Sequence, residues 1–188
     1  RRQQRRNLVM VVDTILFGDC RETLKEFDGK ARTCVTSPPY YGLRDYGGEE
    51  SQIGQEQTPE EYIQNLVEVF RSVRDVLTDD GTLWVNIGDS YYNYRPGKGQ
   101  ALPKQTVSKT KQDLPDKCAK RGNKLEGLKE KDLIGIPWML AFALRADGWY
   151  LRQDIIWHKP NPMPESVKDR CTKSHEYIFL LSKNRKYY

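Results

Sequence analysis

The chain has 188 residues and a formal net charge of +5, with 37% hydrophobic and 30% charged residues. This length suits one domain with a buried core, and no run is long or apolar enough for a membrane span. The basic balance favours a polyanionic partner without establishing one. The four cysteines lack paired C-x-x-C spacing. We therefore expect no metal site, and reduced thiols in a cytoplasmic compartment.

Hydrophobic periodicity predicts strands and helices that alternate along most of the chain. In chain order, the expected elements are a strand at 8–19, a helix at 20–27, a strand at 31–37, a helix at 58–81, a strand at 82–89, a helix at 136–149, and strands at 150–159 and 175–183. Such alternation is typical of an α/β fold with a largely parallel sheet covered by helices. No helix separates the last two strands, so one of them is expected to run antiparallel.

The strongest helix signal lies at 58–81. Thr58 is suited to cap this helix, Pro59 fits its first position, and Glu61 completes a capping box. Gly81 is expected to end it. One apolar stripe recurs with helical spacing and comprises Tyr62, Leu66, Val69, Phe70, Val73 and Leu77.

A long basic segment at 91–131 separates the expected strand at 82–89 from the helix at 136–149. Lysine and arginine far outnumber acids there, and apolar residues are too sparse for a core. A loop of this length is either functional or disordered. Two interpretations stay open: a solvated, mobile insertion, or an arm that follows phosphates and becomes ordered on DNA.

The residues Ser37-Pro38-Pro39-Tyr40 directly follow the expected strand at 31–37. In an open α/β sheet, ligands bind at the carboxyl ends of strands. Pro38 has no N–H and Pro39 restricts it to an extended backbone, so the segment is stiff. The Ser37 hydroxyl and the Pro38 carbonyl can each accept one hydrogen of an exocyclic amino group, and Tyr40 offers a face for stacking a planar base. The structural alternative is a proline-stiffened turn with a packing tyrosine.

The stretch "TSPPYYGL" resembles the catalytic motif of amino-group DNA methyltransferases, which read (D/N/S)-P-P-(Y/F) after a strand. The TSPPY form is typical of the subgroup that methylates the 4-amino group of cytosine. Other blocks resemble the same family in its order: "GDCRETL", "GTLWVNIGDSY", "DIIWHKPNPMPES" and "TKSHEYIFLLSK". The likeness covers nearly the whole chain outside 91–131.

This resemblance implies a Rossmann-like, S-adenosylmethionine-dependent methyltransferase sheet, with 1–188 as the catalytic part. The implied catalytic residues are Ser37, Pro38, Pro39 and Tyr40. The implied cofactor-binding residues are Asp19, Cys20, Thr36 and Ser37, with a helix cap as the alternative role of Asp19. The family's F-x-G-x-G cofactor loop, expected after the catalytic motif in this permuted class, is absent from the sequence. The sheet is therefore expected to be incomplete, and the chain to be the N-terminal part of a longer protein or only its ordered part.

Double-stranded DNA is the expected partner, and the target base is expected to leave the stack so that its amino group reaches the methyl group. The residues expected to contact DNA are Tyr41, Arg44, Lys98, Lys104, Lys109, Lys111 and Lys159. His158, Lys159 and Asn161 either line the site or shape a proline turn, while His175 and Glu176 are expected to be structural. A homodimer is left open.

Three alternatives remain beside cytosine methylation. Adenine could be methylated at its 6-amino group by the same motif. The chain could be a DNA-binding module with an inactive site, as the missing glycine loop suggests. The motif could also serve an RNA base or a protein amide, because the basic segments do not distinguish RNA from DNA.

Overall fold

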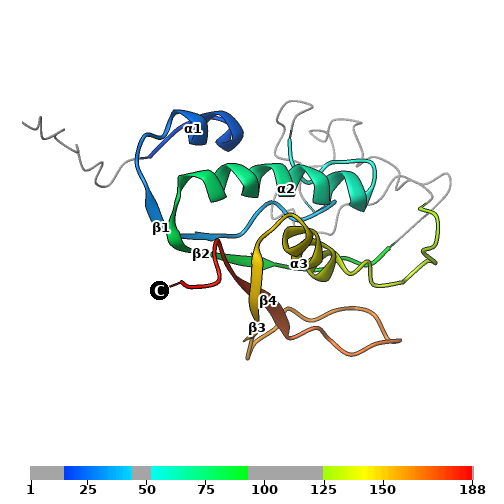
Figure 1. The fold of residues 1–188 in the computed structure, drawn as a ribbon. Coiled ribbons are helices and arrows are strands. Elements are labelled where there is room, and N and C mark those ends of the chain that lie inside the picture. Colours follow the sequence, from blue (N-terminus) through cyan, green and yellow to red (C-terminus); the bar gives the residue numbers. More distant parts are fainter. Residues whose placement is uncertain (1–14, 44–51, 93–124, 188) are drawn as a thin grey trace, which may run out of the picture.

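The computed structural model describes residues 15–43, 52–92 and 125–187 (Figure 1). Within these ranges the elements are α1 (Cys20–Glu26), β1 (Ala31–Thr36), α2 (Pro59–Val76), β2 (Leu77–Ile87), α3 (Ile136–Ala146), β3 (Tyr150–His158) and β4 (His175–Ser182). None of these helices is long and apolar enough to cross a membrane. Strands and helices alternate as the sequence predicts, up to the two final strands.

The four strands form one mixed sheet in the order β1-β2-β4-β3. β1 runs parallel to β2, and β4 runs antiparallel to both β2 and β3. Three strands therefore point the same way and only β4 is reversed, which confirms the expected antiparallel strand. The connection from β3 to β4 contains no helix, so the chain turns back beside the strand it has just left.

Helices α2 and α3 lie on the same side of the sheet and build the core against it (Figure 1). Thr58 and Glu61 form the predicted capping box, with Pro59 in the first turn. Five members of the predicted stripe are buried: Tyr62, Leu66, Phe70, Val73 and Leu77. Alternate β2 residues, Leu83, Val85 and Ile87, meet them from the sheet, because successive strand side chains point to opposite faces.

An ion pair and a hydrogen bond also join the last turns of α2 to the residue after α3. The Arg71 guanidinium on α2 pairs with the Asp147 carboxylate, just after α3, at 2.5 Å. Arg74, one helical turn further on, donates to the Asp147 carbonyl oxygen at 2.6 Å. These contacts fix the start of β3 relative to the helix layer.

The expected end of the helix at Gly81 is wrong. α2 ends at Val76, and β2 begins at the next residue. Ala31 pairs with Leu77 and Thr33 with Thr82, so residues 78–81 bulge opposite a single β1 residue. A Cβ on Gly81 would lie 2.9 Å from the Leu77 Cβ and from the Thr78 carbonyl oxygen. The glycine therefore permits a tight bulge and does not stop the helix.

The expected strand at 8–19 is absent from the part of this range that the structure describes. Residues 15–19 form no strand, and residues 8–14 lie outside the described ranges. Ile15, Leu16 and Phe17 are exposed, with Phe17 at 87%. A strand needs a neighbour to pair with, and no described residue supplies one here.

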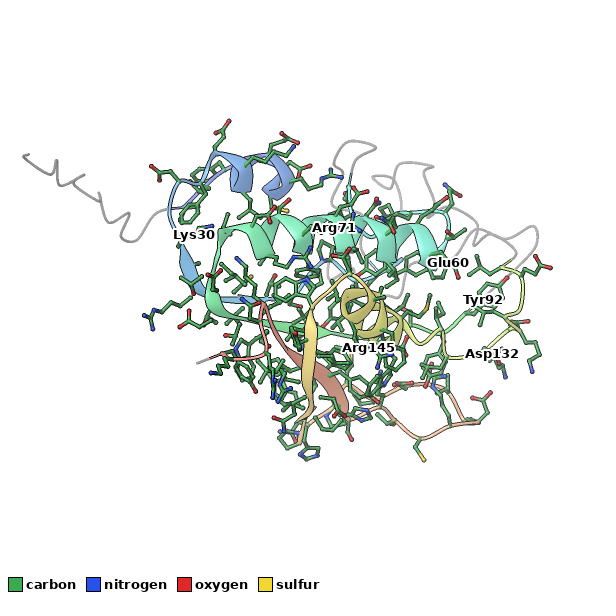
Figure 2. All side chains as sticks on the ribbon, in the orientation of Figure 1. Lys30, Glu60, Arg71, Tyr92, Asp132 and Arg145 are labelled. Carbon is green, nitrogen blue, oxygen red and sulfur yellow. The ribbon has the colours of Figure 1, made fainter. Side chains whose placement is uncertain are left out.

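The basic segment at 91–131 is described only at its two ends, and residues 93–124 lie outside the described ranges. Tyr92 and Asp132 lie side by side (Figure 2), and the Tyr92 N–H donates to the Asp132 carbonyl at 2.8 Å. The Lys131 N–H donates back to the Tyr92 carbonyl, also at 2.8 Å. The two ends are therefore held together, and the predicted mobility between them stays a prediction.

Leu83→Ala is expected to lower the free energy of unfolding by about 2–5 kcal/mol, because Leu83 is fully buried and its removal leaves a cavity. The matched control is Leu133→Ala, since Leu133 is 48% exposed and should cost about 0.5 kcal/mol or less. Urea denaturation measures both. Similar losses in the two variants would mean that the sheet does not carry the core described above.

Candidate active site

The Ser37–Tyr40 loop leaves β1 at its carboxyl end, beside the same end of β2. Pro38 is buried, whereas Ser37 and Pro39 are exposed. The Tyr62 hydroxyl on α2 donates to the Pro39 carbonyl at 2.7 Å, which ties the loop to the core. Within the described residues, no hydrogen bond reaches the Pro38 carbonyl oxygen. The Ser37 hydroxyl and the Pro38 carbonyl are therefore the polar groups that stand at the end of β1.

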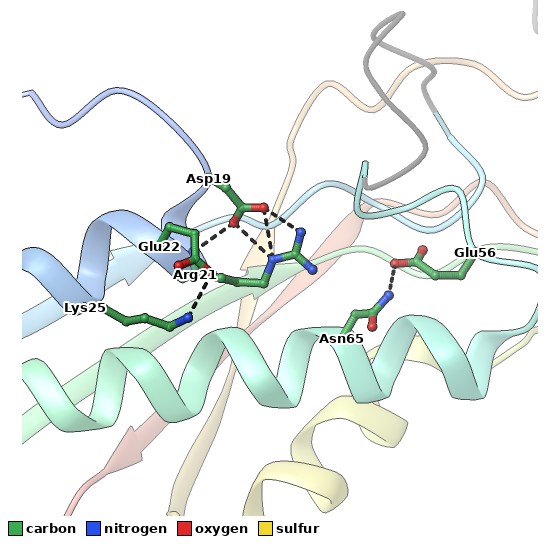
Figure 3. Close-up of polar contacts among 6 residues, drawn as sticks. All are labelled: Asp19, Arg21, Glu22, Lys25, Glu56 and Asn65. Atoms are coloured by element: carbon green, nitrogen blue, oxygen red, sulfur yellow. Dashed lines mark hydrogen bonds and ion pairs between the residues drawn. The ribbon is translucent and has the colours of Figure 1, made fainter.

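A second loop, which contains Gly54 and Glu56, lies against the Ser37–Tyr40 loop. The Gly42 N–H donates to the Gly54 carbonyl at 2.8 Å. Gly54 has φ of +99°, and a Cβ there would lie 3.1 Å from the Tyr40 carbonyl oxygen, so only glycine fits without strain. Glu56 holds this second loop on α2, because it accepts from the Gly54 N–H and from the Asn65 amide, both at 2.8 Å (Figure 3). The backbone around Tyr40 is therefore rigid.

The Tyr40 ring packs directly on the backbone of Gly88, just after β2. A Cβ at Gly88 would lie 2.6 Å from the Tyr40 Cε2 atom. The far end of the ring is held too, because the Tyr40 hydroxyl lies 3.2 Å from Asn86 Oδ1 and 3.3 Å from Glu176 Oε2. Burial, with a smaller contribution from Glu176, raises the pKa of the Tyr40 phenol, which keeps it protonated at neutral pH.

Side chains alternate between the two faces of a strand, and this alternation brings these polar groups together on one face of the sheet. Thr36 pairs with Val85, so the next residues along, Ser37 and Asn86, lie side by side, and the Ser37 hydroxyl donates to Asn86 Oδ1 at 3.4 Å. Val85 and Ile87 face the helices, so Asn86 faces the opposite side of the sheet. Asn86 is paired with Ile178 of β4, and Glu176, two residues earlier, shares that face.

Glu176 is the charged centre of this cluster. Its Oε2 atom accepts from the Asn86 amide at 3.2 Å, and its Oε1 atom pairs with the Lys159 ammonium. The side chain of Glu176 is only 20% exposed. Burial acts to raise the pKa of the Glu176 carboxyl, but the hydrogen bonds from Lys159 and Asn86 outweigh it and hold this pKa below its usual value. Glu176 is therefore a carboxylate at neutral pH.

The residues expected to contact DNA are only partly described. Tyr41 packs its ring 5.5 Å from that of Tyr62, and its hydroxyl donates to the Gln57 carbonyl at 3.3 Å. Burial, with nearby acidic residues, raises the pKa of Tyr41 to about 12. Lys159 is 40% exposed and pairs with Glu176. Arg44, Lys98, Lys104, Lys109 and Lys111 lie outside the described residues.

Asp19 takes the capping role that the sequence left open. Its carboxylate accepts from the Arg21 backbone N–H at 2.8 Å and pairs with the Arg21 guanidinium at 2.5 Å (Figure 3). The Arg21 side-chain hydrogen bonds hold the pKa of this carboxyl below its usual value. Cys20, the first residue of α1, is exposed. A ligand at Asp19 would have to share the carboxylate with Arg21.

These residues fit only part of a site for S-adenosylmethionine. Thr36 and the exposed Ser37 stand at the strand end where a nucleoside ligand of an α/β sheet would lie. Asp19 is already neutralised by Arg21, so it is a poor free acceptor for ribose hydroxyls. Among the described residues, no three acids, histidines or cysteines gather as a metal site.

The sequence did not single out Asn86 or Gly88, and it predicted a structural role for Glu176. Glu176 does stand at the start of a strand as predicted, but its side chain reaches the Tyr40 hydroxyl. Its position could have indicated Asn86, because Asn86 lies near the carboxyl end of the strand next to the one that leads into Ser37. Asp89 was also missed, and it accepts from the Gly135 and Ile136 N–H groups at 3.0 Å, which caps α3.

A family model described as DNA methylase, covering enzymes of the N6 and N4 type, matches residues 31–188. The chain therefore belongs to this DNA methylase family. The match begins at the first residue of β1 and includes the Ser37–Tyr40 loop, Asn86, Lys159 and Glu176.

Curated relatives of this chain are named type II methyltransferases. The chain is 54% identical over 180 residues to the type II methyltransferase M.SmaI of Serratia marcescens, and the match covers 93% of this chain and 57% of that protein. It is 53% identical over 176 residues to M.Cfr9I of Citrobacter freundii, covering 93% and 56%. The chain thus spans little more than half the length of these relatives.

Solved structures share the fold at low sequence identity. PvuII DNA methyltransferase (cytosine-N4-specific) superposes with a TM-score of 0.57 at 16% identity, over 90% of this chain and 49% of that chain. TTHA0409 of Thermus thermophilus, a putative DNA modification methylase in complex with S-adenosyl-L-methionine, gives 0.56 at 21% identity, over 91% and 53%. The expected methyltransferase fold is therefore confirmed.

Proposed function

We propose that the full-length protein transfers a methyl group from S-adenosylmethionine to an exocyclic amino group of a DNA base. Membership of the DNA methylase family and the type II methyltransferase relatives support this function. The observation that carries it is the Ser37–Tyr40 loop, which presents a hydroxyl, a carbonyl that is unbonded among the described residues, and an aromatic ring held by Asn86. These are two hydrogen-bond acceptors and a stacking face, which suit an amino group on a planar ring.

Ser37 is oriented to act as an acceptor. Its proton points to Asn86 Oδ1, so the lone pairs of the Ser37 oxygen are free for an amino hydrogen. The Pro38 carbonyl accepts the second hydrogen. Holding both hydrogens out of the ring plane draws the nitrogen lone pair away from the ring and towards the methyl donor, and such positioning is the main source of catalysis here.

When bound, S-adenosylmethionine would supply an electrophilic methyl group to the amino nitrogen that Ser37 and the Pro38 carbonyl hold in place. Thr36 and Ser37 are the described residues placed to line that side of the site. In the proposed permuted order, the cofactor's glycine-rich loop lies C-terminal to the catalytic motif.

The target base must leave the DNA stack to reach Ser37. Unstacking costs a few kcal/mol, and stacking on Tyr40 offsets part of that cost. The basic residues at 91–131, together with Arg44, are proposed to follow the phosphates of double-stranded DNA. A homodimer on the duplex is compatible with this role.

The target is proposed to be the 4-amino group of cytosine. Ser37 supports this choice, because a neutral hydroxyl stands where adenine-directed members of the family more often carry an acid. A carboxylate is a stronger acceptor than a hydroxyl, so the difference tunes the site and does not exclude adenine. Finding only 6-methyladenine in DNA treated with the full-length protein would overturn the cytosine assignment and leave the amino-group mechanism intact.

The substrate class is tested by offering duplex DNA, RNA and protein side by side to the full-length protein with labelled S-adenosylmethionine. We expect label in DNA alone. Label chiefly in RNA or protein would overturn the proposed substrate. DNA binding without any transfer would favour a DNA-binding module with an inactive site.

A further inference from the structure

The Lys159–Glu176 ion pair contacts the catalytic loop through the Tyr40 hydroxyl. Glu176 Oε2 lies within hydrogen-bond distance of both the Tyr40 hydroxyl and the Asn86 amide, at 3.3 and 3.2 Å. Lys159 follows β3 directly, and its backbone N–H donates to the Ser174 carbonyl at 2.7 Å, just before β4. The pair is thus built into the β3–β4 connection.

Asn86 transmits the effect of Glu176 to Ser37. The Asn86 amide nitrogen donates to Glu176 and to the Tyr177 carbonyl, both at 3.2 Å. Two acceptors on one side fix which way the amide faces, so its oxygen is turned to Ser37 and Tyr40. If the amide turned round, its N–H₂ group would face the Ser37 oxygen and occupy the lone pair that the substrate needs.

Lys159 keeps Glu176 in the form that this arrangement requires. A carboxylate accepts from Asn86 and Tyr40 together, whereas a protonated carboxyl would compete with them as a donor. The ammonium of Lys159 compensates the half-buried charge, which would otherwise favour protonation.

We infer that Glu176, held by Lys159, is a positioning residue that sets the orientation of the Tyr40 ring and the hydrogen-bond direction of Ser37. This inference rests on the proposed function of the Ser37–Tyr40 loop. It also gives Lys159 a role inside the site, which the sequence left open beside a contact to DNA.

The test compares Glu176→Gln with Glu165→Gln in the full-length protein. Glu165 is a matched control, because it also pairs with a cation, Arg170, and its side chain is 26% exposed against 20% for Glu176. Glu176→Gln is expected to lower kcat about ten- to a hundredfold with little change in the affinity for DNA, because a small displacement of reacting groups has an effect of that size. Glu165→Gln is expected to keep kcat. Equal losses in both variants would overturn the inference.

Lys159→Gln separates the two roles of the lysine. If Lys159 positions Glu176, kcat falls as in Glu176→Gln and the salt dependence of DNA binding is unchanged. If Lys159 contacts a phosphate, the slope of log K against log salt falls by about 0.9 while kcat at saturating DNA is kept. The second result would overturn the role of Lys159 given above.

An NMR signal, which can be measured without methyl transfer, tests the inference separately from the proposed function. The ring signal of Tyr40 in protein with ¹³C-labelled tyrosine is assigned by its loss in Tyr40→Phe. We expect this signal to shift in Glu176→Gln and to stay in place in Glu165→Gln. An unmoved signal in Glu176→Gln would overturn the inference. A shifted signal in a protein that methylates no DNA would instead count against the proposed function.

Discussion

Tyr40→Ala is expected to lower the rate of methyl transfer about ten- to a hundredfold while the affinity for DNA changes little. The loss of one stacked base costs about 1–3 kcal/mol in the transition state, whereas most of the binding energy comes from phosphate contacts. One edge of the ring packs on Gly88, and its hydroxyl contacts Asn86 and Glu176. Single-turnover methylation and a DNA-binding titration measure the two quantities.

The matched control for Tyr40→Ala is Tyr41→Phe. Tyr41 is the neighbouring tyrosine, and its hydroxyl donates to the Gln57 carbonyl, away from the cluster around Asn86. This variant keeps the ring that packs on Tyr62 and should keep most of the transfer rate. If Tyr40→Ala weakened binding and transfer equally, Tyr40 would be a packing residue and the stacking role would be wrong.

Gly88→Ala is expected to lower the transfer rate by about a hundredfold in a protein that still folds. The added Cβ would lie 2.6 Å from Tyr40 Cε2 and 3.1 Å from Cδ2, so the ring must move. A displacement of about 1 Å near the reacting atoms is enough to cost about 10²-fold in rate. Methylation rates and thermal unfolding are measured on the same preparation.

Gly127→Ala is the control for the added methyl group. Nothing lies within 4 Å of a Cβ at Gly127, but its φ of +83° makes alanine cost about 1–2 kcal/mol. This variant should lose stability and keep the transfer rate. Gly88→Ala at the wild-type rate would show that the position of Tyr40 on Gly88 is not needed for catalysis.

Local signals made much of the fold predictable from the sequence. The capping box at Thr58 and Glu61 and the apolar stripe of α2 are set by neighbouring residues, and both are confirmed. Gly81 shows the limit of such signals, because a glycine after a helical stripe also suits a bulge. Only the register of β1 against β2 distinguishes the two roles.

The candidate site was predictable only in the part that is continuous in sequence. Ser37, Pro38, Pro39 and Tyr40 are adjacent and carry a recognisable pattern. Glu176 lies 136 residues from Tyr40, and their contact depends on β4 entering the sheet between β2 and β3. No local pattern encodes that strand order. The contact between Glu176 and Tyr40 could therefore not be predicted from the sequence.

The most direct test of the central claim identifies the atom that carries the methyl group. Duplex DNA methylated by the full-length protein with labelled S-adenosylmethionine is digested to nucleosides, which are separated and identified by mass spectrometry. Because Ser37 and the Pro38 carbonyl are placed to accept amino hydrogens, the label is predicted on an exocyclic amino nitrogen, as 4-methylcytosine. Label on a ring carbon, as 5-methylcytosine, would contradict the role of the Ser37–Tyr40 loop.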